Sequence, residues 1–323
     1  MVMSWTARVL FGVLGLACAG SARADDYPNH PVRIVVPYAT GGGVDIAARL
    51  LAQQLTEQLK QTFIVEDKPG ATGVLGSQVV GSAKPDGHTL LYAATAEAII
   101  PFLPGGASFD VERELTPITL VVSTPFVMVV NPNIPVSNPR ELAQYVKQHP
   151  DAFRWGLGGL GSPDHLAIEL FDQQAGINPV TVPYQGGGPA IIATLSGEVG
   201  GIMDPPSLVK SYVDSGQLKG LGIGSSRRSE VMPEMPTIAS FGFSGYEAST
   251  WYGLWGPRGM SQELADKIQR YVLTALTTPA FKEKMLATAL ALQGSKPDEF
   301  AAFFHAEIAK YGRLIKDRDL HFK

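Results

Sequence analysis

Apolar residues along this chain follow two spacings, one typical of strands and the other of helices. The run VRIVVP at 32–37 predicts a buried strand, whereas 45–59 has apolar residues at 46, 50, 51, 55 and 59, the stripe of an amphipathic helix. Strand and helix patterns then alternate. Further strands are predicted at 62–65, 89–93, 120–130, 153–156, 180–184, 201–204, 218–223 and 246–255, and further helices at 76–83, 138–149, 162–175, 189–196, 207–215, 261–277, 279–290 and 297–315.

This alternation predicts an α/β protein in which mainly parallel sheets are flanked by helices. The apolar run 120–130 is broken at Pro125 and is long enough to leave one domain for another. The chain changes character again at MPEMP (232–236). We therefore expect two lobes, the first built from 25–124 together with 236–323 and the second from 125–235.

The first residues resemble an export signal and not part of the fold. A positive start (1–8) precedes the apolar stretch 9–19, and Ala22-Arg23-Ala24 is a small-x-small cleavage motif. We predict a signal peptide at 1–24 and a periplasmic protein of a Gram-negative cell. An N-terminal membrane anchor and lipidation of Cys18 remain open alternatives. No later apolar run approaches the roughly 20 residues that span a bilayer.

Composition narrows the choice of partners. Cys18 is the single cysteine of the 323 residues, so the predicted mature chain has neither disulfides nor thiol chemistry. Removing residues 1–24 would leave 24 basic and 30 acidic residues, a net charge of −6. Without a basic cluster, nucleic acid and anionic membranes are poor partners, and an anion would have to be bound by local groups.

Three loops share the order strand, glycine-rich loop, helix start. They are YATGGG at 38–43, GLGGLG at 156–161 and YQGGG at 184–188. Glycines allow a ligand to approach the backbone closely, and a helix N-terminus adds unpaired N–H donors and a positive dipole end. Each loop alone could be a plain turn. Three on alternating units favour an anion site that needs no lysine or arginine.

Other chemistries fit less well. The loop at 156–161 matches G-x-G-x-x-G but lacks the acidic residue expected about 20 positions later, and no loop has a P-loop lysine. Ser162 and His165 could form a nucleophile–base pair, but Ser-Pro-Asp is a typical helix start, so we favour capping. The histidines are scattered, which argues against a metal site.

Four further residues have both a structural and a ligand-binding interpretation. Asp45 would repel a bound carboxylate, so we favour its capping backbone N–H groups in the first turn of its helix. Asp204 could cap a helix or select a polar group of the ligand, and Thr95 could place its hydroxyl in a cleft or only make a turn. Trp251 and its aromatic neighbours are expected in the core.

Several motifs occur in a fixed order from about residue 26 onwards. YP and PVRIVVP are followed by GGGVD, DKPGATG (67–73), KPDGHTL (84–90), Gly161-Ser162 with His165, and VPYQG (182–186) with Pro189. Together they resemble the Bug-type solute-binding proteins, the periplasmic receptors of tripartite tricarboxylate transporters. The resemblance implies a two-lobed, type II periplasmic-binding-protein fold with a small carboxylate, di- or aromatic, held between the lobes through backbone N–H groups and water.

The glycine loops and the positions carried over from the family give one predicted ligand-binding set: Tyr38, Ala39, Gly41, Gly42, Gly43, Thr95, Gly159, Ser162, His165, Tyr184, Gln185, Gly186, Gly187, Gly188 and Asp204. Three features depart from the family. Gln185 stands where a lysine is common, Gly187 and Gly188 replace bulkier small residues, and Asp204-Pro205-Pro206 replaces a turn richer in asparagine and leucine. The identity of the carboxylate therefore stays open.

The predicted function is that of a monomeric receptor without cofactor or metal that serves the membrane subunits of a transporter. A ligand-sensing adaptor for a membrane sensor kinase is an alternative that the sequence does not separate from transport. A carboxylate-acting enzyme is a third, but no converging base and nucleophile support it.

Overall fold

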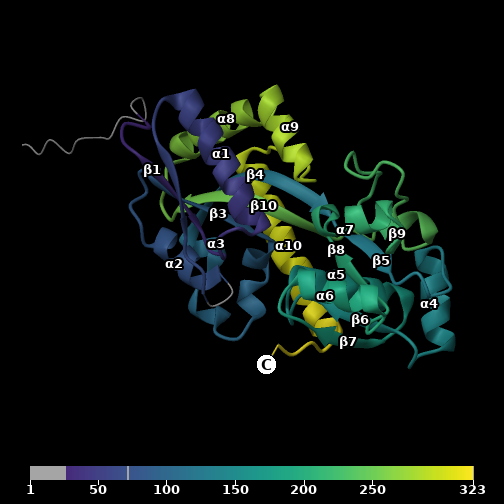
Figure 1. Cartoon of the computed structure of the whole chain (residues 1–323). Coiled ribbons are helices and arrows are strands. Elements are labelled where there is room, and N and C mark those ends of the chain that lie inside the picture. The colour runs from purple at the N-terminus through teal and green to yellow at the C-terminus, as the bar shows by residue number, and fades with distance from the viewer. Residues whose placement is uncertain (1–26, 71–72, 323) are drawn as a thin grey trace, which may run out of the picture.

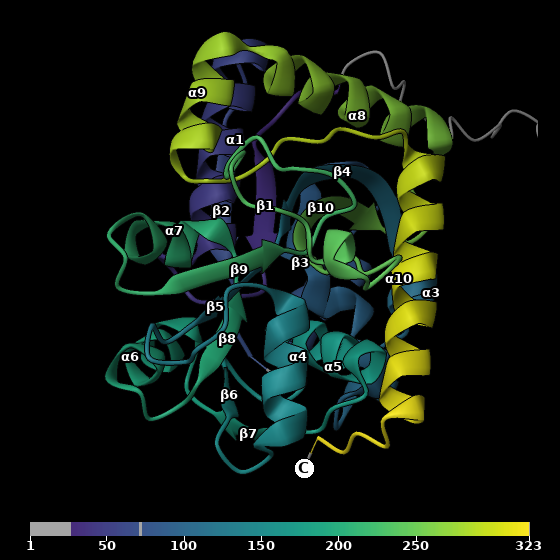
Figure 2. The ribbon, with the colours of Figure 1, turned by 90° about the vertical axis from the view of Figure 1, so that its right-hand side faces the viewer.

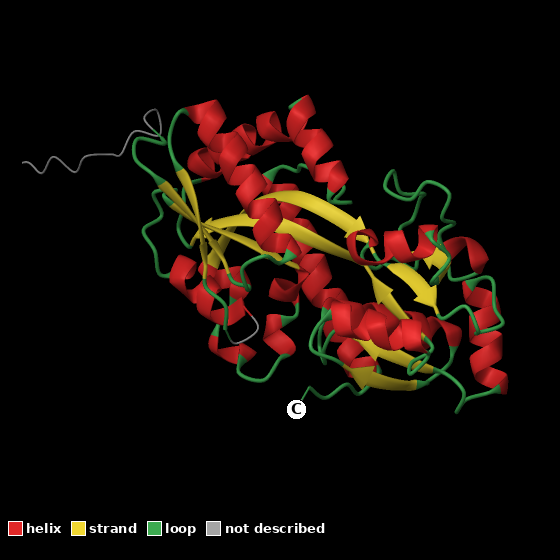
Figure 3. Cartoon of the chain, in the orientation of Figure 1, coloured by secondary structure: helices red, strands yellow, loops and turns green. Residues whose placement is uncertain are grey.

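The structure is a computed structural model that describes residues 27–70 and 73–322, so the predicted signal peptide and Cys18 lie outside the described part. The described chain forms two lobes, each with a five-stranded sheet between layers of helices (Figure 1, Figure 3). No helix in this part of the chain is both long and apolar enough to cross a membrane.

The first lobe has the strand order β2-β1-β3-β10-β4. Its strands are β1 (Val32–Val36), β2 (Phe63–Asp67), β3 (Thr89–Ala94), β4 (Leu115–Pro125) and β10 (Ser249–Pro257). Its helices are α1 (Gly43–Leu59), α2 (Val74–Gly81), α3 (Val111–Glu114), α8 (Gln262–Thr277), α9 (Pro279–Ala287) and α10 (Pro297–Asp317). Three short 3-10 helices, η3 (Thr95–Ala98), η4 (Ile100–Phe102) and η5 (Gly106–Ser108), follow β3, where the sequence predicted no element.

The second lobe has the strand order β7-β6-β8-β5-β9. Its strands are β5 (Val127–Val130), β6 (Arg154–Leu157), β7 (Val180–Pro183), β8 (Gly201–Asp204) and β9 (Lys219–Ile223). Its helices are α4 (Pro139–Gln148), α5 (Pro163–Ala175), α6 (Gly187–Ser196), α7 (Pro206–Asp214) and the 3-10 helix η6 (Ile238–Phe241).

Strand direction brings particular strand ends to the gap between the lobes. β1, β2 and β3 are parallel, and β4 points the same way because both β3 and β4 pair antiparallel with β10. β4 ends at Pro125, where the chain enters the second lobe, so the carboxyl ends of β1–β3 face that lobe. In the second lobe β5 starts at the crossing and runs antiparallel to β8, which is parallel to β6, and β6 is parallel to β7. The carboxyl ends of β6–β8 therefore face the first lobe.

Each sheet is mixed: four of its strands share one direction, as predicted, but the fifth strand runs against them between two of the four, so two of the four pairings are antiparallel. The exceptions, β10 and β5, both begin at the crossing between lobes and must run against the strands that end there.

Three segments lie side by side where the chain crosses between the lobes. Phe126 N–H donates to the Ala248 carbonyl (3.0 Å), Gly224 N–H to the Phe126 carbonyl (2.8 Å) and Ala248 N–H to the Gly224 carbonyl (2.9 Å). The first crossing lies where the break at Pro125 predicted it. The return crossing was predicted at 232–236, but the structure puts it near Ala248, because Ile238 and Tyr246 are still buried in the core of the second lobe. The other predicted residue bounds of the two lobes stay predictions.

A groove of about 820 Å³ lies beside these crossing segments. Its lining includes Ser123, Gly224 and Ser249 from the crossing, Arg227 from the loop after β9, and Leu276 and Leu286 from α8 and α9. β4 and β9 are the edge strands at this side of the two sheets. The groove and the carboxyl ends of β1 and β6 are therefore on opposite sides of the crossing.

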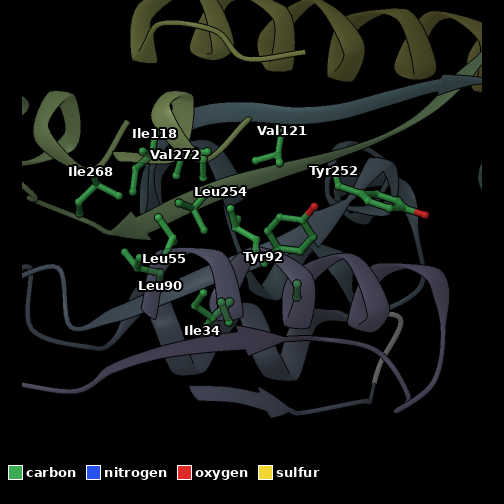
Figure 4. Close-up of a cluster of buried hydrophobic side chains, with 14 of the residues drawn as sticks. Ile34, Leu55, Leu90, Tyr92, Ile118, Val121, Tyr252, Leu254, Ile268 and Val272 are labelled. Carbon is green, nitrogen blue, oxygen red and sulfur yellow. The ribbon is translucent and has the colours of Figure 1, made fainter. Parts of the chain in front are cut away.

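Alternating side chains of the first sheet pack against two helix layers. Ile34, Tyr92 and Leu254 pack with α1, α8 and α9 (Figure 4). The opposite face carries Trp251, whose ring lies among Phe300, Phe303 and Phe304 of α10. The expectation that the aromatic segment around Trp251 belongs to the core is confirmed.

Helix α10 extends along both lobes, as Figure 2 shows for the yellow helix. It packs against α5 of the second lobe. Near its end the Arg318 Nε donates to Glu169 Oε2 (2.7 Å), and Arg318 Nη2 donates to Asn178 Oδ1 (2.8 Å). The C-terminal part of the first lobe is thus attached to the second lobe on one side of the crossing.

Candidate ligand-binding site

The predicted ligand-binding residues lie along the two facing edges of the lobes. On the first lobe they follow β1 and β3. On the second lobe they follow β6 and β7, lie in the first turn of α5, or end β8. Contacts within each lobe bring several of them together, and these contacts also show which polar groups are already used inside the protein.

The loop after β1 leads into α1 without a side-chain cap. Gly42 is the N-cap residue and no side chain accepts the first-turn N–H groups. Gly41 has a φ of +85°, a conformation that glycine takes without strain, and its N–H donates to Asp45 Oδ2 (2.8 Å). Gly41 therefore shapes the loop. The backbone N–H groups of the first turn of α1, which begins at Gly43, face the second lobe without a side-chain acceptor. Ala39, Gly42 and Gly43 are exposed.

Asp45 has the structural role that the sequence favoured. Besides accepting from Gly41, its Oδ1 lies 2.6 Å from Arg49 Nε, and Arg49 Nη2 reaches Asp67 Oδ2 at 2.8 Å. Burial alone would raise the pKa of Asp45, but the Gly41 N–H and the Arg49 guanidinium lower it below its ordinary value. The charge of Asp45 is thus neutralised within the first lobe.

Tyr38 and Thr95 are used inside the lobe. The Tyr38 hydroxyl accepts from Ala94 N–H (3.2 Å). Thr95 is fully buried, and its Oγ1 accepts from Trp251 N–H (2.8 Å) and donates to the Trp251 carbonyl (3.4 Å). Of the two interpretations of Thr95, the structure gives the structural one, since its hydroxyl holds the end of β3 against β10. Thr95 is therefore part of the framework of the first lobe, and its contact with a ligand stays a prediction.

Ser162 and His165 form a cap and not a catalytic pair. Ser162 Oγ donates to the Gly159 carbonyl (2.5 Å) and accepts from His165 N–H (3.4 Å). His165 is buried, its Nδ1 accepts from Gly161 N–H (3.0 Å), and its Nε2 lies 3.5 Å from Glu169 Oε1. The preference for capping by Ser162 is confirmed. His165 has partners at both ring nitrogens, so it shapes the loop, and its predicted contact with a ligand stays a prediction.

The loop after β7 repeats the design of the loop after β1. Gly186 is the N-cap of α6, again without a side-chain cap, and Gln185 and Gly188 are exposed. Gly186 N–H donates to the Gly158 carbonyl (2.9 Å), which joins the two glycine loops of the second lobe. The Tyr184 hydroxyl donates to Glu198 Oε1 (2.8 Å), so this side chain is held by its own lobe.

Three buried polar groups near these edges were missed or undervalued. Asp164 lies in the first turn of α5 and was taken only as part of a helix start. Asp204 ends β8 and is 5% exposed. Glu97 in η3 is fully buried, with Ser77 Oγ donating to its Oε2 (3.0 Å). Burial raises the pKa of Glu97 to about 8. Asp204 and Glu97 are acidic residues at or within four positions of a predicted strand end, and Asp164 follows the N-cap serine of a predicted helix; these were the available signals.

Known proteins resemble this chain over nearly its whole length. The family model described as "Tripartite tricarboxylate transporter family receptor" matches residues 47–320. Protein BugT of Bordetella pertussis is 31% identical over 325 residues, covering 97% of this chain and 98% of BugT. The R. palustris protein Rpa4515, solved with adipate, is 27% identical with a TM-score of 0.79, covering 91% of this chain and 99% of that chain.

A second solved structure, MatC (Rpa3494) from Rhodopseudomonas palustris with bound malate, is 28% identical with a TM-score of 0.75. It covers 90% of this chain and 100% of MatC. These likenesses confirm the predicted two-lobed periplasmic-binding-protein fold. The chain belongs to the tripartite tricarboxylate transporter receptor family, among its Bug-type members.

Proposed function

We propose that this protein is an exported receptor that captures a small carboxylate between its two lobes and presents it to the membrane subunits of a tripartite tricarboxylate-type transporter. A di- or aromatic carboxylate is the ligand class we favour. The protein itself performs no reaction on the ligand.

One observation carries the proposal: two helices with glycine N-caps begin on facing edges of the lobes. Neither α1, capped by Gly42, nor α6, capped by Gly186, has a side chain that accepts its first-turn N–H groups. Ser162 caps α5, Asn138 caps α4 and Ser261 caps α8 through their side chains. The helices α2 and α7 also lack a side-chain cap, so α1 and α6 are distinguished by their position on facing edges together with an exposed glycine in the first turn of each. Open N–H groups at a positive dipole end suit a carboxylate.

The energetics favour binding by the closed protein. Charge-assisted hydrogen bonds to a carboxylate contribute roughly 1.5–3 kcal/mol each, and they strengthen when water is excluded between the lobes. A ligand that contacts both α1 and α6 binds a closed arrangement better than an open one, so it shifts the population toward closure. A membrane partner would recognise the closed shape.

The relatives support this ligand class, since one solved structure holds adipate and another holds malate. The enzyme alternative is disfavoured by Ser162, whose hydroxyl donates to a backbone carbonyl and not to the ring of His165. The sensor-adaptor alternative would use the same site and the same closure.

The proposal is tested by thermal denaturation of the protein from residue 25 onwards with mono-, di- and tricarboxylates, aromatic acids and acidic amino acids. Binding to the native state alone raises the melting temperature, by an amount that corresponds to about 2.7 kcal/mol at 100 times Kd. A shift with one carboxylate class is the expected result. If no compound shifts the transition, the protein is denatured and the released small molecules are identified; no shift and no released carboxylate would contradict the proposal.

Transport is separated from sensing by uptake measurements. Vesicles that contain the transporter's membrane subunits are expected to accumulate the identified carboxylate only when the receptor is added. Uptake that does not depend on the receptor, together with ligand-dependent binding to a sensor kinase, would favour the adaptor function instead.

A further inference from the structure

Two buried carboxyl groups lie directly behind the glycine loops of the second lobe. Asp164 is 7% exposed and Asp204 is 5% exposed. A Cβ atom at Gly187 would lie 2.7 Å from Asp204 Oδ2, and one at Gly158 would lie 3.3 Å from Asp164 Oδ2. The acids therefore fill the space that side chains at these two loop positions would occupy, on the edge that faces the first lobe.

The two acids differ in their partners. Asp164 Oδ2 accepts a hydrogen bond from Gly158 N–H at 2.6 Å, which fixes the loop after β6. Asp204 Oδ2 is buried but accepts no hydrogen bond from any described residue. A buried carboxyl oxygen without a donor is costly, and native proteins seldom keep one without a function.

Lysine and arginine side chains do not compensate these acids within the described part of the chain. Burial raises the pKa of Asp164, and the adjacent His165, the nearest positive influence, lowers it only in part. No ion pair among the described residues joins a lysine or arginine to Asp164 or Asp204; Lys210 of the adjacent α7 is paired with Asp214. Burial first, and then the neighbouring Asp164 carboxyl, raise the pKa of Asp204 well above its ordinary value. Leu208, which also faces Gly187, is apolar.

We propose that Asp204, backed by Asp164, accepts a hydrogen bond from a hydroxyl or ammonium group of the ligand, so that the second lobe selects carboxylates that carry such a donor. This inference rests on the proposed function, because it names the ligand class of the same site. The α1 side would hold the ligand's carboxylate, and the acid pair would hold the donor.

The preference for ligands that carry a donor follows from the unpaired Asp204 Oδ2 and from the lack of a lysine or arginine partner for this carboxyl group among the described residues. A carboxylate without a hydroxyl or ammonium group leaves the buried Asp204 Oδ2 without a hydrogen-bond donor. A hydroxyl satisfies the free oxygen, and an ammonium group also supplies the missing positive charge. Sites built to bind a polar group discriminate strongly against analogues that lack it.

The inference is tested by titration calorimetry with matched compounds. Succinate, malate and aspartate differ only in the substituent on carbon 2, and glutarate, 2-hydroxyglutarate and glutamate repeat the comparison with one more carbon. Benzoate, 4-hydroxybenzoate and 4-aminobenzoate cover an aromatic ligand. In the series that binds, we expect at least one donor-bearing compound to bind at least tenfold more tightly than the plain acid.

Asp204→Ala then removes the acceptor, and the preference is expected to fall below threefold. Asp214→Asn, an exposed acid of the same lobe, serves as the matched control and is expected to keep the preference. The melting temperature of ligand-free Asp204→Ala checks the fold; it is expected not to fall, because the variant removes a buried acid that lacks a donor.

The outcomes separate the two claims. Equal affinity for plain and donor-bearing compounds, unchanged in Asp204→Ala, overturns the role of Asp204 but leaves carboxylate capture intact. A preference that persists in Asp204→Ala also overturns it. Failure of all three series and of the wider carboxylate panel removes the proposed function and this inference together.

Discussion

Arg318 of the first lobe and Glu169 of the second lobe form an ion pair, with 2.7 Å between Arg318 Nε and Glu169 Oε2. The pair is mostly buried, since the arginine side chain is 17% exposed and the glutamate side chain 7%. It connects the end of α10 to α5, next to His165 and the glycine loop that precedes it. The contribution of this ion pair to the free energy of unfolding can be measured on the ligand-free protein.

We expect Arg318→Met to lower the free energy of unfolding by about 2–3 kcal/mol at pH 7, because it leaves Glu169 buried without its guanidinium partner. Burial alone would raise the pKa of Glu169, but His165 and Arg318 lower it below its ordinary 4.5. The stabilisation is therefore present above pH 4.5 and is lost as the pH falls below that value. Urea titrations at pH 7 and pH 4 measure both effects.

Arg258→Met is the matched control, because Arg258 pairs with Glu114 while 58% exposed. Exposed pairs contribute less than about 1 kcal/mol. Equal losses for the two arginine variants would contradict the interpretation of Arg318.

A substitution at Gly188 tests whether the N-terminus of α6 contacts the ligand's carboxylate. No atom lies within 4 Å of a Cβ placed there, and its φ does not require glycine. In Gly188→Asp the new carboxylate occupies the first turn of α6, where it stabilises the helix by about 0.3–1 kcal/mol and repels an anion. We expect at least tenfold weaker carboxylate binding and an unchanged or higher melting temperature.

Gly188→Asn has nearly the same shape without the charge, so it is expected to lose much less affinity than the aspartate variant. If the two variants bind the identified carboxylate equally well, α6 does not contact the ligand's negative charge.

Glu97 is expected to make stability depend on pH. Its pKa is raised to about 8 by burial, so the folded protein keeps a proton that the unfolded chain releases near its ordinary 4.5. Stability should therefore fall as the pH rises between 4.5 and 8, by at most about 1.4 kcal/mol per pH unit. Glu97→Gln should reduce this slope, to which the buried Asp172 and Asp204 also contribute through their raised pKa values, and be more stable than the wild type at pH 8.

Melting temperatures at pH 5, 6.5 and 8 measure the slope, and exposed Glu57→Gln is the control that should retain it. A Glu97→Gln variant with the wild-type slope would show that another group is responsible.

Gly187 and Asp204 should be energetically coupled. Gly187→Ala places a methyl group 2.7 Å from Asp204 Oδ2, and we expect a loss of about 1–3 kcal/mol. The loss should shrink in the Asp204→Ala background, which a double-mutant cycle of urea unfolding measures. Gly188→Ala, where the space is open, should cost little; additive effects at 187 and 204 would argue against the contact.

Much of the fold could be predicted because it depends on local pattern. The apolar run at β1, the serine before α5 and the asparagine before α4 each specify their element through neighbours in sequence. Pro125 marked the first crossing for the same reason. The return crossing was placed too early because the prolines of 232–236 suggest a boundary, whereas the burial of Tyr246 in the second core depends on contacts distant in sequence.

The site was predictable at the level of loops but less so at the level of side chains. Glycine runs at strand ends identified both facing edges. Whether Thr95 meets a ligand or Trp251, and whether His165 meets a ligand or Gly161, depends on which backbone groups the tertiary structure brings near them. The pairing of Asp164 with Asp204 joins positions 40 residues apart in sequence, and no local pattern signals it.

The groove beside the crossing segments is open to solvent on the side opposite the proposed ligand site, so a change in the angle between the lobes could be followed there. The described residues contain no cysteine, so Arg227→Cys, on the exposed loop that lines the groove, would accept a single environment-sensitive dye. If ligand capture closes the gap between α1 and α6 by rotation about the crossing, we expect the groove on the other side to widen. A dye there would report closure optically for any ligand, without touching the site that binds it.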